Sequence, residues 1–200
     1  MKIDFKKDAL YKAKVAPAIV DVPCAPFIMV DGVGDPNTSA EYQHAIELLY
    51  ALSYAIKMSP KKDYVPEGYF DYVVAPLEGL WWDTDGSKSD FKWTAMIRQP
   101  EFVTYEVFEY GLSVAKAKKP DLDISLARFV EFEEGLCAQV LHVGSYDDEP
   151  ATIAALDSFI SEQGYALDIT ETRRHHEIYL SDPRKTAPEK LKTIIRHPIK

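Results

Sequence analysis

The same order of predicted elements occurs twice along this chain, and this repeat limits the folds that it can adopt. In the first half, residues 26–30 form an apolar run of strand length, and turn-forming residues follow at 31–37. Apolar side chains then recur at helical spacing up to Met58. Two more strand-like runs lie at 70–82 and 91–98. The first half therefore predicts a strand, a helix and two strands.

The second half repeats this order. It follows a segment of helical spacing at 102–118, which we expect to connect the two halves. A mostly apolar run at 136–144 predicts the strand, and apolar positions within 153–160 predict the helix. Runs at 175–180 and 192–196 predict the last two strands.

Units of this kind cannot bury their apolar faces alone, so we expect the two to pair. The prediction is one α+β domain, a tandem βαββ repeat with antiparallel sheets and a ligand groove between the two halves. An irregular N-terminal segment at 1–24 precedes a single domain at 25–200. Within that domain we place half one at 25–100, a connecting helix at 101–120 and half two at 125–200.

The charge balance argues against nucleic acid as a partner. The 200 residues include 23 Lys and Arg against 32 Asp and Glu, which gives a formal net charge of -9. Binding to a phosphate backbone relies on clustered basic side chains that release counterions, and the sequence has no basic stripe. We therefore expect no nucleic-acid partner.

The remaining composition predicts a cytoplasmic protein. Cys24 and Cys137 are too few for a disulfide framework, and no Cys or His cluster has the spacing of zinc ligands. Residues 1–8 mix both charges and lead into no long apolar run, so we expect neither a signal peptide nor a membrane-spanning helix. The pattern Gly32-x-Gly34 is too short to form a phosphate-binding loop. We expect no metal, no cofactor and no membrane partner, and a monomer or homodimer.

Four segments together resemble the GyrI-like family of small-molecule-binding domains. They are Pro-Leu-Glu-Gly-Leu-Trp-Trp at 76–82, His-Val-Gly-Ser-Tyr-Asp at 142–147, His-Glu-Ile-Tyr-Leu-Ser-Asp-Pro-Arg at 176–184 and Lys-Thr-Ile-Ile-Arg at 192–196. The resemblance implies an SHS2-type tandem βαββ fold around a pocket lined by aromatic side chains and a carboxylate. It also implies a ligand that is a bulky, often cationic, aromatic compound.

The resemblance extends to a subgroup of this family. In multidrug-responsive transcription activators a similar domain follows a DNA-binding helix-turn-helix, and this chain has no residues left for one, so we expect a stand-alone member. The segments 76–82 and 176–180 resemble stand-alone members that open the cyclopropane ring of DNA-alkylating cyclopropanoid compounds. That likeness implies a hydrolase with a role in detoxification.

Glu177 and Tyr179 are the main candidates for chemistry. They are two residues apart on a predicted strand, so their side chains share one face. On the hydrolase hypothesis, burial raises the pKa of Glu177, which takes a proton from water, while Tyr179 or Tyr146 donates to the developing oxyanion. The alternative is an ion pair of Glu177 with Arg173 or Arg174.

Trp81 and Trp82 are candidates for ligand binding. They are adjacent on a strand, so they face opposite sides. Trp82 shares a face with Glu78 and Leu80, and a carboxylate beside an indole suits a pocket for a cation. We therefore favour Trp82 and keep Trp81, with core packing as the alternative for either. Glu78 is a further candidate, unless it only bonds backbone in an edge strand.

Two tyrosines and three histidines complete the set of polar candidates. Tyr146 precedes the second helix, where its hydroxyl either points into the groove or caps a surface turn. Tyr105 is a ligand-binding candidate unless it only packs within its helix. His142, His175 and His176 are not assigned to a metal, because no third ligand has suitable spacing.

Two other functions remain open. The same residues suit a non-catalytic protein that binds and sequesters cationic aromatic drugs. Acidic clusters at 131–134 and 147–149 suit an inhibitor of the gyrase-inhibitor type that binds a basic protein partner, although acidic runs are usually solvated faces.

Overall fold

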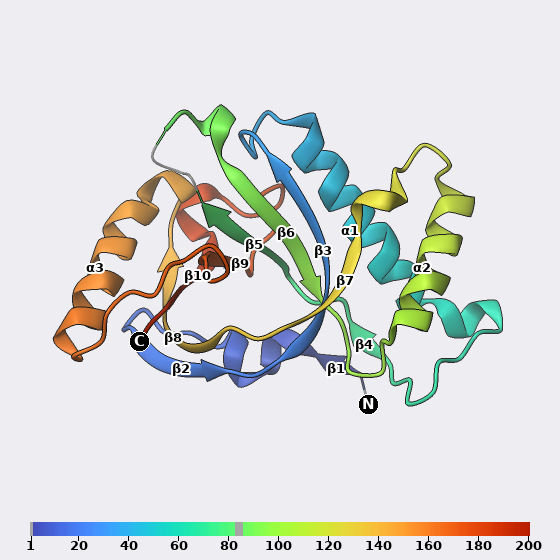
Figure 1. Ribbon diagram of the computed structural model, residues 1–200, viewed down its shortest axis with the longest axis horizontal. Coiled ribbons are helices and arrows are strands. Elements are labelled where there is room, and N and C mark those ends of the chain that lie inside the picture. Colours follow the sequence, from blue (N-terminus) through green and yellow to red (C-terminus); the bar gives the residue numbers. More distant parts are fainter. Residues whose placement is uncertain (1, 83–85) are drawn as a thin grey trace. The chain divides into compact units, whose positions relative to one another are not determined.

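The computed structural model describes residues 2–82 and 86–200 (Figure 1). These residues form two compact units. The described residues of unit 1 are 2–5, 25–77 and 86–132, and those of unit 2 are 6–24, 78–82 and 133–200.

The strands of unit 1 are centred on β3 (Ala25–Val33). This strand pairs antiparallel with β6 (Lys92–Arg98) on one side and with β7 (Arg128–Phe132) on the other. A separate parallel pair consists of β1 (Ile3–Asp4) and β4 (Tyr72–Val73). Because Ile28 and Met96 are almost fully buried, the paired strands form part of the core of this unit.

Two helices complete unit 1. The first, α1 (Ala40–Lys57), packs on β3 and β6 and lies beside α2 (Tyr105–Lys118) (Figure 1). Side-chain oxygens of Ser39 and Thr104 accept hydrogen bonds from backbone N–H groups in the first turns of α1 and α2. The apolar side of α1 is buried through Leu48, Leu49, Leu52 and Ile56.

Unit 2 contains an antiparallel sheet. Its strand order is β2 (Ala18–Val22), β8 (Gly135–Val143), β10 (Lys192–Pro198), β9 (His175–Tyr179) and β5 (Leu77–Trp82). Residue 77 of β5 belongs to unit 1 and residues 78–82 to unit 2.

One face of this sheet is covered by α3 (Glu149–Glu162) (Figure 1). Leu156 and Ile160 of the helix pack in one apolar cluster with strand residues Ala138, Val140 and Ile195. Each of these side chains removes apolar surface from water, which contributes about 25 cal/mol per Å² buried. The helix is therefore fixed on the same sheet face as the odd-numbered residues of β9.

Short 3-10 helices connect the main elements. They are η1 (Phe5–Lys7), η2 (Ala9–Tyr11), η3 (Ser59–Lys62), η4 (Lys88–Asp90), η5 (Ile124–Leu126), η6 (Tyr146–Asp148) and η7 (Pro188–Lys190). Among the residues that the structure describes, no helix is both long and apolar enough to cross a bilayer.

The predicted order of elements is confirmed in both halves. It appears as β3, α1, β5 and β6, and again as β8, α3, β9 and β10, in an α+β fold with antiparallel strands. The predicted run at 70–82 is divided into β4 and β5, with Pro76 between them; proline has no N–H to donate to a ladder. The segment expected to be irregular contains β2, whose residues 18–22 pair with β8.

Candidate functional site

The candidate site is organised by the alternation of side chains along β9. His175, Glu177 and Tyr179 share one face of the strand, while residues 176 and 178 lie on the other. Across the ladder, Glu177 is directly opposite Gly79 of β5, and residue 81 is opposite residue 175. Residues that pair in this way share a face, so Trp81 joins Glu177.

Glu177 is held by hydrogen bonds at both carboxylate oxygens. Its Oε2 accepts a hydrogen bond from the Tyr179 hydroxyl at 2.7 Å, and its Oε1 lies 2.9 Å from His175 Nε2. The Tyr179 oxygen in turn accepts the Trp81 Nε1–H at 3.0 Å. The carboxylate is therefore fixed in orientation, as the predicted pair of Glu177 and Tyr179 requires.

Gly79 makes room for this arrangement. A Cβ atom at residue 79 would lie 2.8 Å from Trp81 Nε1 and 3.2 Å from the Tyr179 hydroxyl. A real Cβ does not approach another heavy atom so closely, so any side chain here would displace the indole or the phenol. Gly79 is therefore part of the site, because its lack of a side chain leaves room for the Trp81 indole and the Tyr179 hydroxyl.

A line of hydrogen-bonded groups continues from His175 away from Glu177. His175 Nδ1 lies 2.7 Å from His197 Nε2, and His197 Nδ1 lies 2.7 Å from Asp157 Oδ1. His197 is on β10 and Asp157 is on α3. Burial and the neighbouring His175 lower the pKa of His197 to about 4.

A second carboxyl group, Glu149, lies beside Glu177. It is the first residue of α3, is 6% exposed, and is hydrogen-bonded to Glu177 and to the Thr193 hydroxyl. Burial and the charge of Glu177 raise the pKa of Glu149 to about 9. Glu149 is therefore protonated at neutral pH and donates to its neighbour.

The pKa of Glu177 shifts in the opposite direction. Burial acts to raise it, but the hydrogen bonds and charge of His175 and the hydrogen bonds from Tyr179 and Glu149 outweigh burial and lower it. The expectation of a raised pKa at Glu177 is therefore wrong, because it considered burial without these donors. The site holds an ionised carboxylate next to a neutral carboxylic acid.

Tyr146 contributes an accessible aromatic ring to this face. It is in η6, is 36% exposed, and its ring meets that of Tyr179 edge-to-face at a centroid distance of 5.8 Å. Burial, followed by the charges of Glu149 and Glu177, raises the pKa of the Tyr146 hydroxyl to about 12. The hydroxyl thus remains a proton donor at neutral pH.

Glu78 lies on the opposite face of the sheet, in a buried group of charges. It is 1% exposed, its Oε1 accepts a hydrogen bond from the Tyr11 hydroxyl at 2.6 Å, and its Oε2 lies 2.9 Å from His176 Nε2. His176 Nδ1 is 2.9 Å from Glu134, which also pairs with Arg196. Two carboxylates and two cations therefore compensate each other here.

The pKa values of this buried group follow from its pairing. Burial alone would lower the pKa of His176, but Glu134 and Glu78 raise it to about 9. Burial would raise the pKa of Glu134, but His176 and Arg196 lower it to about 2. His176 and Glu134 are therefore ionised near neutral pH, and the group joins the N-terminal segment to the sheet through Tyr11.

Trp82 is on the same face as Glu78, as the sequence predicted, and hence not on the face of Glu177. The guanidinium carbon of Arg174 lies 4.7 Å from the centroid of its ring. Arg173 pairs with Asp168. Both arginines that the sequence offered as partners of Glu177 therefore have other contacts.

Tyr105 is in unit 1, on the exposed side of α2. It is 64% exposed and its hydroxyl is hydrogen-bonded to Glu109, which raises the pKa of the phenol. Within unit 2, the structure brings together Glu177, Tyr179, Tyr146 and Trp81 from the sequence-based candidates.

Four groups of the site were not predicted from the sequence: His175 as a partner of Glu177, Glu149, which was assigned only to the acidic cluster 147–149, and His197 and Asp157. The signal for His175 was present, because residues 175 and 177 must share a strand face. The other three come from β10 and α3, and only the pairing of β9 with β10 and the packing of α3 bring them near.

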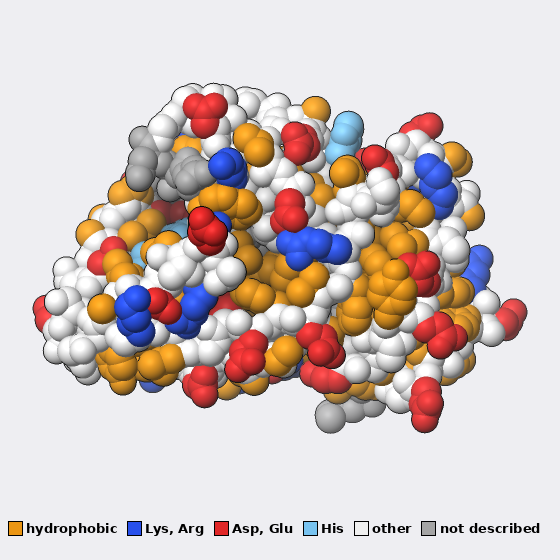
Figure 2. All heavy atoms as spheres, viewed as in Figure 1, with side chains coloured by type: hydrophobic (Ala, Val, Ile, Leu, Met, Phe, Trp, Pro, Cys, Tyr) orange, Lys and Arg blue, Asp and Glu red, His pale blue; other side chains and the backbone are white. Residues whose placement is uncertain are grey.

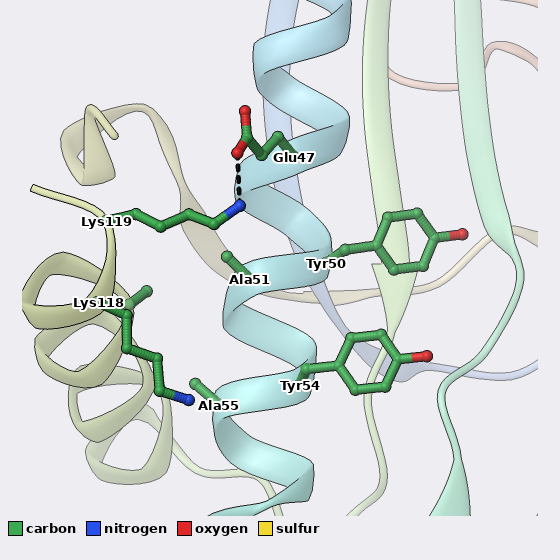
Figure 3. Close-up of a pocket in the computed structure, with 8 residues that line it drawn as sticks. Glu47, Tyr50, Ala51, Tyr54, Ala55, Lys118 and Lys119 are labelled. Atoms are coloured by element: carbon green, nitrogen blue, oxygen red, sulfur yellow. Dashed lines mark hydrogen bonds and ion pairs between the residues drawn. The ribbon is translucent and has the colours of Figure 1, made fainter. Parts of the chain in front are cut away.

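A shallow hollow of about 300 Å³ occurs in unit 1, between α1 and α2. Figure 3 shows the rings of Tyr50 and Tyr54 projecting from α1, and Glu47 paired with Lys119. The hollow is also lined by Ala51, Ala55, Ala115 and Lys118. In the described part of the chain, no three or more His, Cys, Asp or Glu side chains are grouped so that they could hold a metal ion.

Two solved structures resemble the chain over its full length. The chain is 47% identical to a hydrolase from Listeria innocua, with full coverage of both chains and a TM-score of 0.93. It is also 47% identical to an uncharacterized conserved protein from Listeria innocua, again over both full chains, with a TM-score of 0.94.

A more distant structure shares the fold alone. The EcmrR C-terminal domain is 14% identical, with 92% of this chain and 97% of that chain covered and a TM-score of 0.57. No curated protein matches the chain. The family model of the GyrI-like small molecule binding domain matches residues 16–200. The chain therefore belongs to the GyrI-like small molecule binding domain family.

Proposed function

We propose that this GyrI-like protein is a hydrolase that binds a bulky, flat aromatic electrophile at the Glu177 face and adds water to a strained cyclopropane ring. The observation that carries the proposal is the ionised Glu177, oriented by Tyr179 and His175 and hydrogen-bonded to a neutral Glu149. A base and an acid side by side suit a reaction that consumes a water proton and ends with a protonated product. The relative described as a hydrolase supports this choice.

The chemistry balances within these groups. Glu177 takes a proton from water as the water oxygen bonds to a cyclopropane carbon, and a C–C bond of the ring breaks. The electron pair of that bond moves through the conjugated system to the dienone oxygen, which becomes a phenolate. Tyr146, Tyr179 or Glu149 donates to that oxygen, and the proton gained by Glu177 restores the donor.

Aromatic side chains on the same face supply the contacts for a flat ligand. The partly exposed Tyr146 ring offers stacking surface, and an aromatic pair contributes about 0.5 to 1.5 kcal/mol beyond its buried area. Trp81 is only 6% exposed, so its main role in the proposal is to orient the Tyr179 hydroxyl through Nε1.

The test is turnover of a model cyclopropanoid by Glu177→Gln. This substitution keeps the shape and removes the base, so turnover should fall by about 10²-fold or more. Glu133→Gln is the matched control, because residue 133 is exposed. Turnover by Glu177→Gln equal to that of the control would exclude Glu177 as the base.

The second candidate function is a protein that binds and sequesters aromatic drugs without chemistry. It is favoured by the same carboxylate and rings, which would attract an aromatic cation whether or not water attacks it. Quenching of tryptophan fluorescence by such compounds, followed by mass spectrometry of the recovered ligand, separates the two functions. Recovery of an intact cyclopropanoid after long incubation would favour the binder.

A third function, inhibition of a basic protein partner through an acidic surface, has less support than the other two. Within the acidic run 131–134, Glu134 is buried and paired with Arg196 and His176, so it is not offered to a partner. On the face that Figure 2 shows, acidic side chains lie singly or in small groups.

A further inference from the structure

The line of groups from Glu177 through His175 and His197 to Asp157 requires a specific number of protons. It contains three close contacts: Glu177 Oε1 to His175 Nε2, His175 Nδ1 to His197 Nε2, and His197 Nδ1 to Asp157 Oδ1. Each hydrogen bond needs one proton between its two heavy atoms. An ionised carboxylate brings none, so the two imidazole rings must supply all three.

Three protons on two rings leave one net positive charge, because a neutral imidazole carries one N–H. We propose that His175 is a positioning residue: with His197 and Asp157 it holds one imidazolium charge against Glu177, which keeps that carboxylate ionised and oriented toward substrate. The catalytic part of this inference rests on the proposed hydrolysis, whereas the charge itself does not.

The charge resides on His175. The lowered pKa of His197 makes that ring the neutral member, with Nδ1–H donated to Asp157 and Nε2 accepting from His175. His175 then donates from both nitrogens and faces a carboxylate at 2.9 Å. This is the logic by which a buried carboxylate fixes the tautomer of a histidine, extended through a second ring.

The other titratable groups near this line are accounted for. From β9 they are Glu177 and Tyr179, from α3 Glu149 and Asp157, from η6 Tyr146 and from β8 His142. His142 is hydrogen-bonded to the Thr152 side chain and the Ser145 carbonyl. Glu149 and Tyr146 are neutral near pH 7, since burial raises both pKa values. The negative charges nearest to the two rings are thus those of Glu177 and Asp157.

Asp157→Asn is the informative variant because an amide can donate where a carboxylate cannot. If the introduced amide NH2 group donates to His197 Nδ1, that ring can donate from Nε2 to His175 Nδ1, and His175 Nε2–H still reaches Glu177. Every contact is then satisfied with one proton on each ring. The substitution removes the imidazolium without changing side-chain shape, at a position whose side chain is 36% exposed.

The experiment is ¹⁵N NMR of histidine-labelled full-length protein. At neutral pH we expect one of the two rings of this line, that of His175, to be protonated at both nitrogens in the wild type, in addition to the ring of His176. In Asp157→Asn we expect the rings of both His175 and His197 to be neutral, with His197 protonated at Nε2 rather than at Nδ1, while His176 keeps its signal. Asp21→Asn, an exposed position on β2, is the matched control and should keep the wild-type spectrum. Neutral rings at both His175 and His197 in the wild type, or an unchanged His175 imidazolium in Asp157→Asn, would overturn the inference.

A second readout connects the charge to Glu177. Loss of a neighbouring cation raises the pKa of a carboxyl by about 1 to 3 units, so the acid limb of the pH profile of turnover should move upward by about one pH unit or more in Asp157→Asn. An unmoved acid limb beside a lost imidazolium would remove His175 from the positioning role. Absence of turnover in the wild type together with the expected spectra would instead contradict the proposed hydrolysis and leave the charge in place.

Discussion

Gly79 lies directly opposite Glu177 across the ladder of β5 and β9, and the space above its Cα is occupied by the Trp81 indole and the Tyr179 hydroxyl. Because residue 79 has no side chain, Trp81 and Tyr179 can take the positions from which they orient the Glu177 carboxylate. The orientation of Glu177 therefore depends on the residue at position 79.

Gly79→Ala should separate this steric role from the stability of the sheet. A methyl group 2.8 Å from Trp81 Nε1 must displace the indole, and such overpacking costs about 1 to 3 kcal/mol. We expect lower stability in urea, an altered tryptophan emission spectrum and reduced turnover. Gly86→Ala is the control, since no heavy atom lies within 4 Å of a Cβ built there. Identical emission spectra for both variants would contradict the steric argument.

Two substitutions at Tyr146 separate the role of its aromatic ring from that of its hydroxyl. Tyr146→Phe keeps the edge-to-face contact with Tyr179 and removes the donor, so on the proposed hydrolysis kcat should fall with little change in KM. Loss of one oxyanion donor costs about 10²-fold or more in kcat where no second donor compensates. Tyr146→Ala should in addition raise KM because the stacking surface is lost.

Tyr105→Phe on α2 is the matched control for these variants, because its hydroxyl is hydrogen-bonded to the exposed Glu109, away from the Glu177 face. A Tyr146→Phe enzyme with wild-type kcat would assign the donor role to Tyr179 or Glu149.

The free energy of unfolding should be greatest between pH 4.5 and 6.5. Glu134, with its pKa lowered from 4.5 to about 2, contributes stability above pH 4.5 that is lost as pH falls toward 2. His176, raised from 6.5 to about 9, contributes stability below pH 6.5 that is lost as pH rises through 9. Glu149, raised from 4.5 to about 9, contributes stability below pH 4.5 that falls as pH rises toward 9. His197, lowered from 6.5 to about 4, contributes stability above pH 6.5 that falls as pH drops toward 4, so the two contributions oppose each other between pH 4.5 and 6.5.

Urea denaturation across this pH range measures the effect. Glu149→Gln is neutral at every pH, so its stability should decline less steeply between about pH 5 and 9 than that of the wild type. An equal decline in both proteins would show that Glu149 is not protonated in the folded state.

The order of elements could be predicted because strand and helix periodicities are local. Trp81 and Trp82 show the limit of what local periodicity predicts. Their adjacency requires opposite faces, but which of them joins Glu177 depends on the register of β5 against β9, which places Gly79 opposite Glu177. No local pattern contains that register.

The groups that α3 contributes to the site could not be predicted from the sequence for the same reason. Only packing of the helix on the sheet brings Glu149 to Glu177 of β9 and Asp157 to His197 of β10. The direction of the pKa shift at Glu177 was wrong because burial alone raises it, while the donors that reverse the shift come from outside the motif. Pairs two apart on one strand, such as Glu177 with Tyr179, were the part that sequence could supply.

The two faces of β9 carry different charge patterns, and this difference protects the strand against misalignment. A slip of one residue exchanges the faces of every side chain in a strand. Glu177 and His175 would then turn toward Glu78 and Glu134, and His176 would leave both of these carboxylates. Such a mispaired sheet would lose the ion pairs of His176 with Glu78 and Glu134 and place a third carboxylate beside them. The charged groups on the two faces of β9 thus also favour the native register of the sheet over a slip of one residue.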